Sequence, residues 1–140
     1  KVAIANAQLA YVHYELLMAG ARWAPLAEAG AMPQRLLWAS TSTKDPSYRD
    51  VLYIEALIGA DTVNTVPPTT LDAFRDHGEA ANTLAGTAKA AQIQMDAVLA
   101  TGLDLDGITD TLLEDGITIF ADAFVELLAV VEAARVSHTQ

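Results

Sequence analysis

The chain has 140 residues, of which 52% are hydrophobic, so it is long enough for one domain with a core and too apolar for a disordered segment. Its formal net charge of −10, from 18 acidic and 8 basic side chains, argues against nucleic acid and membrane surfaces as partners. It has no cysteine, which fits a cytoplasmic protein, and no apolar run approaches the roughly 20 residues of a membrane-spanning helix.

The first segment has a helical pattern from its first residues. The chain begins at Lys1 inside this pattern, so we expect a fragment of a longer protein. Apolar residues recur at steps of three and four through residues 2–29, which predicts a helix. Gly20 interrupts the pattern, and Pro25 predicts the start of a second, short helix.

A strand and a polar loop come next. The short apolar run at 36–39 predicts a buried strand, and four hydroxyl residues follow it at 40–43. Lys44 comes directly after them, and Asp45 with Pro46 predicts the start of a helix over 46–58. Hydroxyls, a cation and a helix N-terminus at the end of a buried strand suit a phosphate group.

The remaining elements include one more strand. We predict this strand at 62–66, ended by two prolines, and helices after it. The predicted helices cover 69–77, 80–101, 104–116 and 117–134. Two strands joined through one helix indicate a βαβ unit. Because two parallel strands do not make a self-sufficient sheet, we expect the other strands of this sheet outside the chain.

Several stretches of the chain resemble the transaldolase family, most closely the longer bacterial form found in actinobacteria. Together they cover most of residues 3–78 in the order of the family. They are Ile4-Ala5-Asn6-Ala7 with Tyr11, Gly20-Ala21-Arg22-Trp23, Pro33-Gln34-Arg35, Leu37-Trp38-Ala39-Ser40-Thr41, Asp61-Thr62-Val63-Asn64-Thr65-Val66-Pro67-Pro68, and Asp76-His77-Gly78.

The resemblance implies an α/β fold, the (β/α)8 or TIM barrel. Residues 1–140 would form the C-terminal half of one barrel domain, mostly helical with two short parallel strands. Strand seven would lie at 35–41 and strand eight at 62–66, and residues 80–140 would be the C-terminal helices. The N-terminal half of the same barrel would then be a partner of this chain.

The resemblance also implies an activity. Transaldolases of the pentose phosphate pathway transfer a dihydroxyacetone unit between sugar phosphates through a lysine Schiff base. The nucleophilic lysine and the acid–base carboxylates of the family lie on earlier strands, so we expect no catalytic residue in this chain. The imine serves as the electron sink, so neither a cofactor nor a metal is expected. The alternatives are a related Schiff-base sugar-phosphate aldolase and a helical interaction module without catalysis.

The candidate site residues follow the two strands. Ser40 matches the family's phosphate-binding serine after strand seven, and Lys44 is the basic residue that would accompany it, although shorter members usually have arginine at a closer spacing. Thr41 and Asn64 are candidates for the substrate pocket. The alternative for the hydroxyls is a helix cap, for Lys44 a solvated surface lysine, and for Asn64 a partner of turning backbone.

Other chemistry is not favoured. The three histidines, His13, His77 and His138, have no ligand spacing, and His77 before Gly78 suits the C-terminal end of a helix. The apolar stripe of the last helix, which includes Phe120 and Phe124, must be buried on the outside of the barrel or on a second subunit, as in a homo-oligomer.

Overall fold

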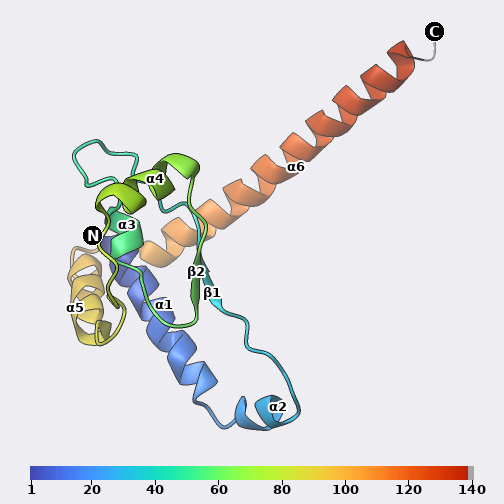
Figure 1. Cartoon of the computed structure of the whole chain (residues 1–140). Coiled ribbons are helices and arrows are strands. Elements are labelled where there is room, and N and C mark those ends of the chain that lie inside the picture. The colour runs from blue at the N-terminus through green and yellow to red at the C-terminus, as the bar shows by residue number, and fades with distance from the viewer. Residues whose placement is uncertain (139–140) are drawn as a thin grey trace. The chain divides into compact units, whose positions relative to one another are not determined.

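The computed structural model describes residues 1–138, which fall into two compact units, Lys1–Val98 and the part that begins at Leu99. The helices and strands are, in chain order, α1 (Val2–Met18), α2 (Ala24–Glu28), β1 (Leu36–Trp38), α3 (Leu52–Glu55), β2 (Thr62–Asn64), α4 (Pro68–His77), α5 (Ala88–Leu99) and α6 (Leu105–Ser137) (Figure 1). The chain is therefore mostly helical. The break between α1 and α2 confirms the interruption predicted at Gly20.

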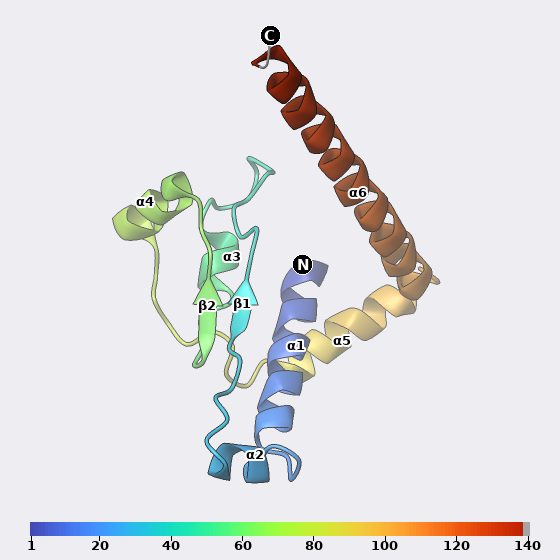
Figure 2. The same cartoon turned by 90° about the vertical axis from the view of Figure 1, so that its right-hand side faces the viewer.

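The two predicted strands pair in parallel, as expected. In their register Leu36 lies opposite Thr62, and Trp38 lies opposite Asn64. Figure 2 shows β1 and β2 side by side with their arrows pointing the same way. Each strand has three residues, fewer than predicted, and a hydrogen bond from Thr65 N to Trp38 O, 2.9 Å long, extends the pairing by one step.

A hydrophobic cluster lies on one face of this strand pair. Its buried members are Ile4, Tyr11, Leu57 and Leu84. Leu36 and Trp38 of β1 pack against the cluster, whereas Leu37 between them is 54% exposed. Successive side chains of a strand point to opposite faces, so β1 has one face on the core and one face open.

The helix predicted over 46–58 is wrong over most of its length. Helix α3 has four residues, and the segment before it forms turns. The Asp45 side chain accepts a hydrogen bond from Ser47 N over 2.9 Å, and Tyr48 N donates to Asp45 O over 3.1 Å. These bonds close a tight turn, which competes with the start of a helix.

Helix α5 begins at Ala88, later than the helix predicted over 80–101. Residues 78–87 instead form a loop that is bound to the end of α3. The Thr83 hydroxyl donates to Glu55 O over 2.6 Å, and Leu84 N donates to Ile58 O over 3.1 Å. These bonds hold Leu84 in the core, where its side chain is 1% exposed.

The second unit contains α6, which replaces two predicted helices. We expected a stop at Gly116, but α6 runs from Leu105 to Ser137 without a break. Its start is as predicted, because the Asp104 carboxylate accepts a hydrogen bond from Gly107 N over 3.0 Å. Within this unit most of the large apolar residues of α6, Phe120 and Phe124 among them, are exposed. No helix among residues 1–138 has both the length and the apolar character to cross a membrane.

We expect Leu84→Ala to lower the free energy of unfolding by about 2–5 kcal/mol, because it leaves a cavity at a buried core position. Urea denaturation followed by circular dichroism measures this change. The matched control is Leu26→Ala, which truncates a leucine that is 53% exposed on α2 and should cost roughly 0.5 kcal/mol or less. Equal effects of the two substitutions would contradict the assignment of Leu84 to the core.

Candidate functional site

The backbone turns sharply where β1 ends. Ser40 has a φ of 57°, in the left-handed region that few residues other than glycine adopt. The next residue, Thr41, turns inward and is 3% exposed. Non-glycine residues in this region are strained, and such strain is concentrated at functional sites. Ser40 thus has an uncommon backbone conformation at the end of β1, which Asp61 before β2 shares with a φ of 55°.

A hydrogen bond joins the ends of the two strands. Thr41 Oγ1 donates to Asn64 Oδ1 over 2.8 Å, between a buried hydroxyl and a half-buried amide. With Oδ1 occupied by this bond, the Asn64 amide is held in one orientation. The structure therefore brings two of the predicted site residues into direct contact.

A pocket of about 550 Å³ lies against the end of β1 and the loop after it. Three predicted site residues, Ser40, Thr41 and Lys44, line this pocket, and Trp38 and Tyr48 form part of its apolar wall. Asn64 is not among its lining residues but is connected to it through Thr41. The four residues selected from the sequence thus lie together.

The expectation that a helix N-terminus contributes to this site is wrong. Residues 46–51 form turns, so the groups near Lys44 are those of a loop. The bond from Ser47 N lowers the pKa of the Asp45 carboxyl. Lys44 also lines a second, more polar hollow of about 480 Å³, together with Ser42, Thr43 and residues of α4.

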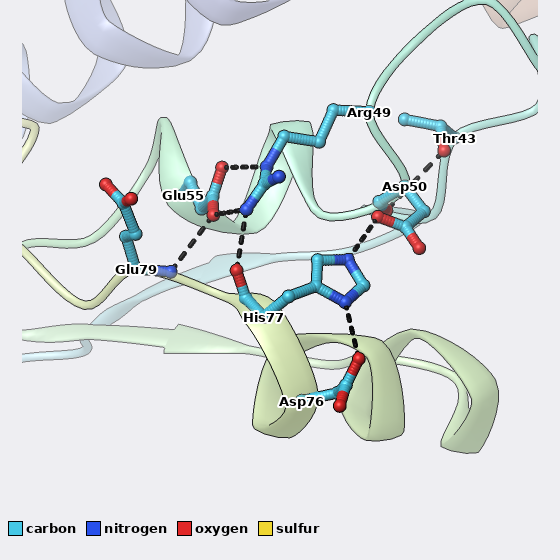
Figure 3. Close-up of polar contacts among 7 residues, drawn as sticks. All are labelled: Thr43, Arg49, Asp50, Glu55, Asp76, His77 and Glu79. Carbon is cyan, nitrogen blue, oxygen red and sulfur yellow. Dashed lines mark hydrogen bonds and ion pairs between the residues drawn. The ribbon is translucent and has the colours of Figure 1, made fainter.

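A second cluster of polar side chains lies beside this loop (Figure 3). Arg49 binds the Glu55 carboxylate with two hydrogen bonds, of 3.0 and 2.9 Å, and its Nη2 also donates to His77 O over 2.7 Å. Glu79 N donates to the same carboxylate over 3.0 Å. The bond from Arg49 lowers the pKa of Glu55 and raises that of Arg49 itself.

The His77 ring lies between two carboxylates. Its Nε2 is 2.9 Å from Asp50 Oδ1, and its Nδ1 is 3.1 Å from Asp76 Oδ2. The bond to Asp50, followed by the bond to Asp76, raises the pKa of His77, and the bond from His77 lowers the pKa of Asp50. The position of His77 at a helix end agrees with the sequence prediction, but its link to Asp50 was not predicted, because the two residues are 27 positions apart. The one sign in the sequence that His77 could matter is that Asp76-His77-Gly78 is among the stretches that carry the family resemblance.

Within the part of the chain that the structure describes, no group of three or more histidine, aspartate or glutamate side chains could hold a metal ion. Lys44 and Lys89 are both exposed, so neither lies in the desolvated environment that makes a lysine nucleophilic at neutral pH. What the site offers chemically is a cation, hydroxyls and an oriented amide beside a pocket. These groups are suited to binding an anion.

Comparison with known proteins points to one family. Residues 1–131 match the family described as transaldolase/fructose-6-phosphate aldolase. The chain is 45% identical to a transaldolase of Thermobifida fusca over 99% of this chain and 38% of that protein. It is 49% identical to a transaldolase of Acidothermus cellulolyticus over 94% of this chain and 36% of that protein. It is 48% identical to transaldolase 2 of a Nostoc species, over 94% of this chain and 35% of that protein. The chain spans just over a third of the length of these relatives.

We expect Thr41→Val to lower the free energy of unfolding by about 1–2 kcal/mol, because it keeps the shape of the side chain and removes the hydroxyl that binds Asn64. Urea denaturation gives the value. Thr69→Val makes the same change at an exposed position on α4 and should have a smaller effect. If the two variants unfold alike, the bond between the strand ends does not stabilise the fold.

Proposed function

The chain belongs to the transaldolase/fructose-6-phosphate aldolase family, and we propose that it is part of a transaldolase. The enzyme would transfer a dihydroxyacetone unit from a ketose phosphate to an aldose phosphate through a lysine Schiff base. Relatives at 45–49% identity that carry the name transaldolase support this proposal. A cytoplasmic location, as expected for sugar-phosphate metabolism, is part of the same proposal.

The strand pair supports a place for the chain in a (β/α)8 barrel. A parallel pair needs neighbouring strands at its edges. Closing these strands into a barrel would also cover Leu37, which is 54% exposed on the open face of β1. We infer that the N-terminal half of the barrel supplies those neighbours, with β1 as strand seven and β2 as strand eight. Residues 1–140 would then form the C-terminal half of one domain, in which residues 80–140 contribute the C-terminal helices.

The observation that carries the proposal is the shared pocket of Ser40, Thr41 and Lys44 after β1. Phosphate sites of such barrels are frequently built from the loops after strands seven and eight. Lys44 would supply the positive charge and Ser40 a hydroxyl donor. Thr41 would act through Asn64, because its own hydroxyl already donates to that amide.

The reaction itself needs groups outside this chain. Imine formation requires a lysine in a partly desolvated pocket and a group that moves protons to and from the substrate. We place both on the earlier strands of the barrel. The iminium would withdraw electrons from the breaking carbon–carbon bond, so the transfer requires no cofactor or metal. This chain would bind the phosphate end of the substrate and so position its carbonyl group near that lysine.

A second candidate is a Schiff-base aldolase, because the family's description names both activities. The two differ in the fate of the three-carbon unit. Transfer to erythrose 4-phosphate identifies a transaldolase, whereas release of free dihydroxyacetone identifies an aldolase. The transaldolase names of the relatives favour transfer. Partners beyond the barrel stay a prediction, including a homo-oligomer in which the exposed apolar residues of α6 are covered.

In the complete enzyme we expect Lys44→Ala to raise the KM for fructose 6-phosphate roughly 10-fold or more, with a smaller change in kcat. A charge-assisted bond to phosphate is present in both the ground state and the transition state, so its loss changes binding more than turnover. Steady-state kinetics measure the changes in KM and kcat separately. Lys89→Ala, at an exposed position on α5, is the matched control. An unchanged KM for the Lys44 variant would remove this residue from the phosphate site.

We expect the 140-residue chain alone to have no transaldolase activity, because the nucleophile would be missing and the open strand face admits water. Mixing it with the separately made N-terminal half should restore part of the activity by complementation. Borohydride trapping with fructose 6-phosphate should label that half and not this one. Turnover by the purified chain alone would overturn the assignment of the missing lysine.

A further inference from the structure

The loop that carries Lys44 is held at both ends. We call residues 42–50 the phosphate loop. Thr41 precedes it and is 3% exposed, and Val51 follows it and is fully buried. Between these anchors residues 44–50 are exposed, so packing alone does not fix their conformation. Polar contacts must do so.

One such contact closes the loop. The Thr43 hydroxyl donates to Asp50 O over 3.5 Å, a long bond that brings the two ends of the loop together. Lys44 is the next residue along the chain from Thr43. Asp50, at the other end, is bound through its side chain to His77 of α4 (Figure 3). The position of Lys44 thus depends on a short chain of contacts that ends at His77.

The geometry at His77 favours the protonated ring. Both ring nitrogens face carboxylate oxygens, at 2.9 Å from Asp50 and 3.1 Å from Asp76. A neutral imidazole has one N–H donor, so it satisfies one of these carboxylates, whereas the imidazolium donates to both. The raised pKa of His77 agrees with this geometry.

The other charged groups around His77 do not cancel this preference. Arg49 approaches the backbone carbonyl of His77, and its charge lowers the pKa of the ring. That charge is balanced by the Glu55 carboxylate, which Arg49 binds with two hydrogen bonds, and Glu79 adds a further negative charge near Arg49. Asp50 and Asp76 remain the groups in direct contact with the ring.

We propose that His77 is a positioning residue that, when protonated, holds the phosphate loop against α4 and keeps Lys44 in place to bind phosphate. Loss of the proton removes one of its two bonds and loosens the loop. The inference rests on the proposed role of Lys44 in phosphate binding. It adds a pH-dependent control to that site. Protonated His77 holds the loop in place at low pH, and this contact is lost at high pH.

The direction of the effect follows from the pKa shift. A histidine whose pKa is raised in the folded protein keeps its proton, and its hold on the loop, at pH values where a free histidine is neutral. The hold is lost as the pH rises through the raised pKa, above the ordinary value of 6.5. Asp50 stays ionised throughout that range because its own pKa is lowered.

The test compares His77→Gln with the unchanged protein in calorimetric titrations with inorganic phosphate, from pH 6 to 8.5, in the complete protein. At pH 6 we expect the Kd of the variant to be about two- to fivefold weaker, the size of effect typical of losing one or two exposed ion pairs. At pH 8.5 the two proteins should bind alike. The ratio of their Kd values cancels the titration of phosphate itself. His13→Gln makes the same change at an exposed histidine of α1 and should leave the ratio at one.

A second variant keeps the test valid if His77→Gln does not fold. Asp50→Asn removes the charge that raises the pKa of His77, so the pH at which phosphate affinity falls should move to a lower value. The pKa of the ring, followed by NMR, should fall with it. A purely structural role for His77 would weaken binding equally at every pH and would not give this shift.

The outcomes separate the inference from the proposed function. A Kd ratio that does not change with pH, or a lack of phosphate binding by the unchanged protein, overturns the role of His77 even if dihydroxyacetone transfer is observed. A pH-dependent ratio in a protein that does not transfer dihydroxyacetone supports the role of His77 and overturns the proposed activity.

Discussion

The parallel pairing of β1 with β2 determines where the polar groups of the site lie. The register that places Trp38 opposite Asn64 brings the carboxyl ends of both strands to the same edge. At that edge Thr41 donates a hydrogen bond to Asn64, and the loop that follows places Lys44 in the lining of the pocket. The same register directs Leu36 and Trp38 onto the core, so the packing that stabilises the first unit also fixes the strand ends.

Local patterns are sufficient to predict the two strands and the edge at which the four candidate residues lie. Short apolar runs that end in hydroxyls, prolines and an asparagine mark both the strands and the edge where their polar groups gather. The arrangement could be predicted because a parallel pair has its carboxyl ends on one side. The resemblance to a barrel family added the expected activity and the match of Ser40 to a phosphate-binding serine, whereas the bond between Thr41 and Asn64 is seen only in the structure.

The errors arose where tertiary contacts outweighed local preference. The turn at Asp45 and the contacts of Arg49 with Glu55 and His77 replace most of the helix predicted over 46–58. At Gly116 the opposite happened, because one glycine costs a helix only about 1 kcal/mol and the flanking residues continue it. The cluster at His77 joins residues from three separate segments, so no spacing in the sequence could reveal it.

Position 40 has a left-handed backbone, which favours glycine, and also carries the hydroxyl proposed to bind phosphate, which glycine lacks. Glycine would adopt this conformation without strain and so favour folding, yet it has no hydroxyl for a phosphate. In the proposed phosphate site, a serine at this position gives up some stability in exchange for a donor group. In a library of variants scored separately for abundance and for turnover, the two rankings should diverge at this residue, with glycine high in the first and low in the second. Such a divergence separates a residue retained for binding from one retained for the fold.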